Sequence, residues 1–353
     1  MIPLAQEKKT FTDLVEDVVD KNLCVSCGTC VAVCPVNVIE LEEGLPRVVG
    51  DCIECGLCYA NCPRTDFSVD EMDEAIHGRT RRENERLTGV YSAAYVARTK
   101  REDIHVKAQD GGVVTSLLYQ FLMDGGDAVI VAGLEEDKIW VPTPVIAKEV
   151  EAVVENAGTK YTPSPTLVGV KRAVKEEKLG NIAVVGTACQ MRGLSRLTQG
   201  KSRNKRFTDS VGLKVGLFCM ETFNYGDLMD YLRSNGVDPG KVTKFEIKKG
   251  RFYAHQGDEV AHRARLKKVK ALIRPCCHIC DDFTSEFSDV SVGNVGSLDG
   301  WSTVIVRTDR GEKALNSAAE SGLIELEPME DFEEGETLVH RLAKSKKESA
   351  LDE

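Results

Sequence analysis

The sequence predicts a small α+β module at the N-terminus, followed by a larger α/β domain with a mixed or mostly parallel sheet. Three observations in the 353 residues support this division. Eight of the 13 cysteines lie in the first fifth of the chain. A densely charged stretch follows them, and beyond it strand-like apolar runs alternate with helical periods. We therefore expect a module over 1–67, a charged linker over 68–90, an α/β domain over 91–325 and a charged tail over 326–353.

The N-terminal cysteines form two ladders with the same spacing, each followed by a proline. This is the pattern of bacterial two-cluster ferredoxins, in which the fourth cysteine of each ladder serves the other cluster. A disulfide framework and structural zinc are the alternatives, but neither predicts a complete double ladder. The sequence therefore predicts two [4Fe-4S] clusters in a ferredoxin-like module. One is assigned to Cys24, Cys27, Cys30 and Cys62, and the other to Cys52, Cys55, Cys58 and Cys34.

The composition is that of an ordinary globular protein, with 42% hydrophobic and 29% charged residues. No apolar run approaches the roughly 20 residues that cross a bilayer, and the first ten residues lack the order of a signal peptide. We expect no direct membrane insertion and a cytoplasmic protein, or one peripheral to a membrane complex. The net charge of -10 argues against nucleic acid as the main partner. The basic run 263–270 is interpreted as a solvated helix face.

The elements are predicted in order from apolar periodicity. Helical spacing before the first ladder predicts a helix over Thr10–Val19. The charged stretch has too few large apolar residues for a core of its own, so it is expected to be a linker or an exposed helix. Strands are predicted at 91–96, 128–132, 181–185, 211–218, 290–292 and 303–307, and helices at 113–123, 190–198 and 225–235. The tail has little to bury, so its end is expected to be mobile.

The remaining five cysteines all fall in the α/β domain. Cys189 and Cys219 come directly after predicted strands, and Cys276, Cys277 and Cys280 share one loop. Sites in α/β folds assemble at strand ends, so the two strand-end cysteines and the Cys-x-x-Cys loop can converge on one metal site. Taken singly, a cysteine of this kind is more often an inert core thiol.

Several separated motifs of this domain resemble the family of coenzyme F420 hydrogenase/dehydrogenase beta subunits. They are Gly-Thr-x-Cys-Gln at 186–190, Arg-x-x-Cys-x-x-Cys-x-Asp-Phe at 274–283, Val-Gly-Asn at 292–294 and STVIVRTDRG at 302–311. The resemblance covers roughly 91–323 and implies FAD, one [4Fe-4S] cluster and hydride exchange with F420. With the ferredoxin-like module in front, the layout is similar to that of the electron-input subunit of F420H2 dehydrogenase complexes, and ferredoxin-linked F420 oxidoreductases share it.

The resemblance also implies a ligand set for a third cluster. By motif, this set comprises Cys189, Cys219, Cys277 and Cys280. Cys276 stands where the family pattern tolerates a small residue, so it is expected to be a buried thiol that binds no iron.

Two loops are candidates for contacts with the flavin. Gly111 and Gly112 precede a helical period that starts with Val113 and includes Thr115, and a helix N-terminus favours a bound anion. A Gly-Gly pair alone is more often a turn, but a similar loop at this point of the family assigns it to FAD. A second matching element holds Lys160 and Tyr161. Lys160 either binds a phosphate or lies beside the flavin ring, with a surface ion pair as the alternative.

The sequence has no Gly-x-Gly-x-x-Gly fingerprint and no P-loop, which disfavours nicotinamide binding and nucleotide hydrolysis. Its six histidines show no spacing typical of a metal site. The predicted function is a coenzyme F420 oxidoreductase that passes hydride between F420 and FAD, and single electrons through three clusters. The expected redox partner is a ferredoxin, a hydrogenase, a heterodisulfide reductase or a membrane dehydrogenase complex. The alternatives are a subunit of an F420-linked sulfite or glutamate-synthase-type reductase, and a non-catalytic ferredoxin-like relay.

Overall fold

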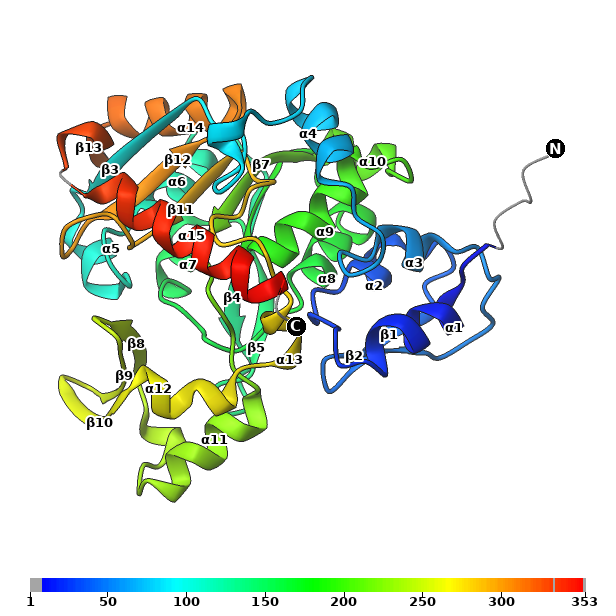
Figure 1. Cartoon of the computed structure of the whole chain (residues 1–353), viewed down its shortest axis with the longest axis horizontal. Coiled ribbons are helices and arrows are strands. Elements are labelled where there is room, and N and C mark those ends of the chain that lie inside the picture. The colour runs from blue at the N-terminus through cyan, green and yellow to red at the C-terminus, as the bar shows by residue number, and fades with distance from the viewer. Residues whose placement is uncertain (1–7, 333, 352–353) are drawn as a thin grey trace.

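An eight-stranded mixed sheet forms the centre of the computed structural model, which describes residues 8–332 and 334–351. Its strand order is β13-β3-β12-β11-β7-β6-β4-β5 (Figure 1). The strands are β3 (Ala93–Thr99), β4 (Ala128–Leu134), β5 (Pro142–Ala147), β6 (Ile182–Thr187), β7 (Val211–Leu217), β11 (Val290–Gly293), β12 (Ser302–Val306) and β13 (Ile324–Pro328). β4, β6, β7 and β11 run parallel, and the flanking pairs are antiparallel. The predicted α/β domain with a mixed sheet is confirmed.

Helices cover both faces of this sheet because its apolar side chains alternate between two cores. Val129 of β4 belongs to one core and Ile130 to the other. The first face carries α6 (Val113–Met123), α7 (Val150–Glu155) and α14 (Asp309–Glu320). The second face carries α8 (Thr166–Lys171), η3 (Arg172–Glu176), α9 (Ala188–Gln199), α10 (Lys205–Ser210) and α15 (Gly335–Leu351). The short helix α5 (Glu102–Lys107) follows β3.

A second, antiparallel sheet is inserted between β7 and β11 and was not predicted. It consists of β8 (Lys244–Lys248), β9 (Arg251–Gln256) and β10 (Glu259–Arg265), accompanied by α11 (Tyr225–Ser234), η4 (Pro239–Lys241), α12 (Leu266–Val269) and η5 (Lys270–Leu272). Phe223, Phe245 and Phe252 centre its separate core. The basic run 263–270, predicted as a solvated helix face, spans the end of β10, α12 and the start of η5. Its lysines Lys267, Lys268 and Lys270 are exposed, and Val269 between them is fully buried.

The N-terminal module consists of two cysteine loops around a short hairpin. Its elements are α1 (Phe11–Leu14), η1 (Val15–Val19), α2 (Thr29–Val33), β1 (Ile39–Glu42), β2 (Leu45–Val48) and α3 (Leu57–Asn61). Gly28 and Gly56 occupy equivalent positions before α2 and α3, with φ of 84° and 77°. This left-handed conformation is one that glycine adopts without strain. The repeated ladder is therefore a repeated turn and helix, as expected for a ferredoxin-like module.

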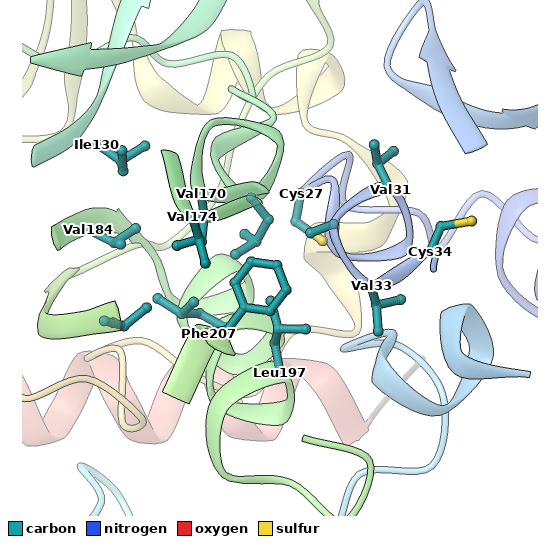
Figure 2. Close-up of a cluster of buried hydrophobic side chains, with 14 of the residues drawn as sticks. Cys27, Val31, Val33, Cys34, Ile130, Val170, Val174, Val184, Leu197 and Phe207 are labelled. Atoms are coloured by element: carbon teal, nitrogen blue, oxygen red, sulfur yellow. The ribbon is translucent and has the colours of Figure 1, made fainter. Parts of the chain in front are cut away.

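The module shares one hydrophobic core with the large domain. Figure 2 shows Cys27 and Val33 of the module close to Leu197 and Phe207, which pack onto the sheet face. All four side chains are at most 7% exposed. Apolar side chains of the module therefore form part of the hydrophobic core of the large domain.

Residues 68–90, expected to be a charged linker or an exposed helix, hold a helix that packs on the large domain through one buried side. Ser68 caps α4 (Val69–His77), which packs against α9, and η2 (Glu83–Glu85) follows. Arg81 pairs with Asp73 and with Glu286, at 2.7 Å in both cases, and all three side chains are at most 9% exposed. Buried ion pairs stabilise this segment, whose sequence has few large apolar side chains. Residues 68–90 therefore form a packed connection between the module and the domain, which we call the joint.

The C-terminal segment also differs from the expected mobile tail. After η6 (Met329–Asp331), α15 crosses the sheet face in front of β3 and β12 (Figure 1). Val339 and Ala343 of α15 are at most 2% exposed and pack with Val96 and Ile305. Charged residues dominate its sequence, but its apolar positions share one face. Across the described residues, none of the helices combines the length and apolarity of a membrane span.

Candidate functional site

The module gathers its eight cysteines around two hollows, four at each. The first hollow is lined by Cys24, Cys27, Cys30 and Cys62, together with Pro63 and apolar side chains of α1 and η1. The second is lined by Cys34, Cys52, Cys55 and Cys58, together with Val36 and Ile53. These are the two crossed sets that the ladder spacing predicts. Cys34 and Cys62 each lie with the ladder to which they do not belong.

Burial raises the pKa of several of these thiols. It raises the pKa of Cys27 to about 12 and the pKa of Cys62 to about 11. The proximity of other thiols, Cys62 and Cys24 beside Cys27, adds to the rise. Four convergent thiols in an apolar enclosure suit a group that brings its own positive charge, because coordination to a metal deprotonates a thiol outright.

The α/β domain gathers a third set of cysteines at the carboxyl ends of its parallel strands. Cys189 lies in the first turn of α9, directly after β6, and Cys219 follows β7. Cys277 is on α13 (Pro275–His278), and Cys280 comes just after it. The four thiols lie near enough that the charges of Cys277 and Cys280, when ionised, raise the pKa of both Cys189 and Cys219. The set implied by the family motifs is thus brought together in space.

Hydrogen-bond donors already face these sulfurs. The backbone N–H and hydroxyl of Thr222 lie 3.4 and 3.5 Å from the Cys277 Sγ. The Thr187 hydroxyl lies 3.3 Å from the Cys189 Sγ, and Thr187 also begins α9 with a capping box. Donors of this kind stabilise thiolates, as does the N-terminus of a helix.

Cys276 adjoins Cys277 but is not one of the four cysteines of the predicted set. It is 1% exposed and belongs to the core shared with the module. Its thiol hydrogen-bonds to Cys277, which lowers the pKa of Cys277 and raises that of Cys276. This burial agrees with the expected core thiol.

Two arginines connect the third cysteine set to the module. Arg64, two residues after Cys62, donates to the Cys276 carbonyl over 2.6 Å. In the opposite direction, Arg274 donates to the Cys24 carbonyl and to the Ser26 hydroxyl, over 2.8 Å each. The first module hollow and the third cysteine set are therefore neighbours.

The glycine loop is held tightly between strands. A Cβ on Gly111 would meet the Ala97 carbonyl and the Ser302 nitrogen at 2.7 Å each, so close packing alone requires glycine here. Gly112, with φ of 70°, is the N-cap of α6, whose first residues Val113 and Thr115 are buried. The first amides of a helix have no partner inside it, so this end remains suited to an anion.

Lys160 and Tyr161 lie on a segment near this loop. The Lys160 Nζ donates to the carbonyls of Asn156, Ala157 and Gly158, and no ion pair to Lys160 is found among the described residues. Burial lowers its pKa to about 8. The Tyr161 hydroxyl accepts from the Ile247 N–H at 2.9 Å.

Asp110 connects the two loops and was missed from the sequence. Burial raises its pKa to about 6, and its charge acts on Tyr161. Next to it in the chain, the side-chain oxygen of Gln109 is buried with no hydrogen-bond partner among the described residues. Unpartnered buried polar atoms are costly, so this region suits a polar ligand. No local pattern marks Asp110, because its role depends on contacts across the fold.

Within the described residues, no three His, Cys, Asp or Glu side chains stand close enough to hold a single metal ion. The thiolates around a [4Fe-4S] cube each bind a different iron, so they lie farther apart than the ligands of one ion.

Three family models match successive parts of the chain. Residues 16–63 match the 4Fe-4S dicluster domain. Residues 94–171 and 179–332 match the N-terminal and C-terminal parts of the coenzyme F420 hydrogenase/dehydrogenase beta subunit.

Individual proteins agree with these matches. The chain is 39% identical to the beta subunit of the coenzyme F420 hydrogenase of Methanothermobacter thermautotrophicus, over 75% of this chain and 94% of that one. It is 30% identical to a subunit of the F(420)H(2) dehydrogenase of Methanosarcina mazei, over 94% and 92%. A chain of the F420-reducing [NiFe] hydrogenase complex from Methanosarcina barkeri superposes with a TM-score of 0.71 at 36% identity, covering 76% of this chain and 92% of that one. The chain therefore belongs to the family of coenzyme F420 hydrogenase/dehydrogenase beta subunits and carries a 4Fe-4S dicluster domain in addition.

Proposed function

We propose that this chain passes hydride between coenzyme F420 and FAD, and passes single electrons through three [4Fe-4S] clusters to or from a redox partner protein. The observation that carries the proposal is the third cysteine set, gathered at the carboxyl edge of the sheet and joined to the module by Arg64 and Arg274. Such an arrangement would connect a cluster in the α/β domain with the clusters of the module. Electrons would then enter in the α/β domain and leave through the module, or pass in the reverse direction.

The cysteines divide into three ligand sets. Cys24, Cys27, Cys30 and Cys62 hold the inner module cluster, and Cys34, Cys52, Cys55 and Cys58 hold the outer one. Cys189, Cys219, Cys277 and Cys280 hold the third. The domain organisation proposed with them is a module over 1–67, a joint over 68–90 and the flavin domain over 91–325, followed by a C-terminal segment over 326–353.

FAD is proposed to bind between the start of α6 and the Lys160–Tyr161 segment. A flavin accepts hydride and releases single electrons, which is the conversion that F420 and iron-sulfur clusters require between them. Gly111, Gly112, Val113 and Thr115 present the helix end to a phosphate. The unpartnered side-chain oxygen of Gln109 and the partly buried cation of Lys160 support a polar ligand here.

The outer cluster is the proposed point of exchange with the protein partner. Cys52 is exposed, and so are Val36, Val49 and Ile53 around it, at 40%, 58% and 58%. Several acidic residues border this apolar face, including Glu54. An electron carrier with an apolar contact and a basic rim would fit it.

The iron content tests the third site. Reconstituted protein should hold roughly twelve irons by the cysteine count, and Cys277→Ala should lose one cluster while Cys276→Ala keeps all three. Iron and acid-labile sulfide analysis measures both. About eight irons in the wild type would remove the third site.

The reaction itself is tested by anaerobic stopped-flow spectroscopy. F420H2 should bleach the bound flavin and NADH should not, because the chain has the F420 family motifs and no dinucleotide fingerprint. Purified protein without flavin bands would favour a non-catalytic relay. Bleaching by NADH alone would refute the substrate.

A second candidate is the flavin subunit or region of an F420-linked reductase whose acceptor site lies on another chain. The chain is 33% identical to the coenzyme F420-dependent sulfite reductase of Methanocaldococcus jannaschii, over 90% of this chain but 49% of that protein. Co-purification of a sulfite-reducing subunit would favour this second function.

A further inference from the structure

Two cations flank the third cysteine set, and they come from segments far apart in the chain. Arg64 follows the last ladder cysteine and interacts with Cys189 and Cys280. Lys346 projects from α15 and interacts with Cys219, Cys277 and Cys280. Between them, the two cations reach all four thiols. Both lie outside the residues that match the family models.

Hydrogen bonds fix each cation beside the cysteines. Arg64 donates to the carbonyl of Cys276, next to Cys277. Lys346 donates to the carbonyl of Met220, next to Cys219. Each cation is thus held through the backbone of a residue that adjoins a predicted ligand, so its position follows that of the cysteine loop.

Neither cation has an ion-pair partner among the described residues, although Lys346 is 5% exposed and the Nε of Arg64 is buried without a hydrogen-bond acceptor. Neighbouring cations differ in this respect. Arg192 pairs with Asp281, and Lys347 pairs with Glu286, at 2.7 Å each. The Glu221 carboxylate acts on Lys346 but forms no ion pair with it. A buried charge without a paired counter-ion is costly, so an anion between Arg64 and Lys346 would be stabilised.

We infer that Arg64 and Lys346 are the counter-charges of the third cluster and raise its reduction potential. The inference rests on the proposed third cluster. Four thiolates outweigh the positive charge of an iron-sulfide core, so the bound cluster is an anion. Its reduction adds one electron and makes it more negative, and nearby cations stabilise that form most. Because Arg64 belongs to the module, docking of the module sets the potential of a cluster in the other domain.

The test is a redox titration of the full-length reconstituted protein, followed by electron paramagnetic resonance. The signal that Cys277→Ala removes identifies the third cluster. Arg64→Gln and Lys346→Met should each lower its midpoint potential, and the double variant should lower it further. Arg64→Lys and Lys346→Arg keep the charge and should stay near the wild type. Lys344→Met, which removes an exposed cation from the same helix, is the matched control and should leave the potential unchanged.

Each other outcome decides the question. If the third cluster is present in both neutral variants at an unchanged potential, the inference is wrong while the proposed function stands. If a neutral variant loses the cluster and its charge-conserving counterpart keeps it, the counter-charge role is supported. If both lose it, the side chain serves packing and the inference fails. If the wild type has no signal that depends on Cys277, the proposed third cluster fails with it.

Discussion

Lys214 shows what one buried charge does to this fold. It lies in the middle of β7 at 2% exposure, where its Nζ donates to the Ser195 hydroxyl and the Gln199 side chain. Burial lowers its pKa to about 8, although Asp289 opposes the shift. The cation is held by neutral acceptors in a sheet core, so its contribution to stability depends on pH.

We expect the free energy of unfolding of the wild type, relative to Lys214→Met, to rise between pH 8 and 10.5. Below about pH 8 the lysine is charged in both states, so the full cost of burying the charge remains. Between the folded pKa and the ordinary lysine value of 10.5, the unfolded chain binds more protons, so stability rises with pH. The gain should be on the order of 3 kcal/mol. Anaerobic denaturant unfolding at several pH values measures it.

The exposed Lys313 on α14 supplies the control for this measurement. Lys313→Met should follow the wild-type curve across the range. A Lys214→Met difference that is flat with pH would contradict the buried charge.

At the scale of elements, the joint formed by residues 68–90 depends on Arg81. Arg81→Met leaves the buried Asp73 without its partner and Glu286 with Lys347 alone. Breaking a buried pair typically costs ~3–5 kcal/mol, so the variant should be less stable than the wild type. Proteases should therefore cut it faster than the wild type, and first within 68–88. The sequence alone, in contrast, predicts that proteases cut the wild type first within this same segment.

Limited proteolysis of both forms distinguishes these expectations. Arg86→Met is a matched control, because Arg86 makes only an exposed pair with Glu83, worth at most about 1 kcal/mol. If wild type and Arg81→Met are cut at the same rate in this segment, the joint is not held by the ion pairs.

The strands at the centre of the large sheet could be predicted from the sequence, and the strands at its edges could not. The strands β4, β6 and β7 are buried on both faces, so they read as continuous apolar runs. The edge strand β5 carries Pro142 and Pro144, which a central strand excludes but an edge tolerates, and β8 to β10 alternate with charged residues. The residues of helix α15 were predicted to be a charged tail because the apolar face that the helix buries is narrow.

The same division holds at the site. The ladder cysteines could be grouped from the sequence because the ferredoxin pattern relates their spacing to the hollows that they line. Arg64 and Lys346 were not, since their positions depend on contacts between residues far apart in the chain. No local pattern distinguishes them from surface cations.

For the molecule as a whole, the shared core predicts that the module is not freely separable. A fragment lacking residues 1–67 would expose the face of Leu167, Val170, Leu197 and Phe207. We expect this fragment to aggregate and to bind an apolar dye, as measured by size-exclusion chromatography and dye fluorescence. Exposed apolar patches of this kind favour association. A monomeric fragment that still holds flavin would show instead that the module is an independent unit.

The neighbourhood of the third cysteine set also has a consequence for how the protein is made. Arg64 is synthesised early, the four cysteines over the middle and late parts of the chain, and Lys346 later than all of them. The ladders lie within a short stretch, so their cysteines can meet while translation continues. The third set acquires both cations only after residue 346 has left the ribosome. Contacts between residues so distant in sequence form slowly, which makes this neighbourhood one of the last parts of the protein to mature.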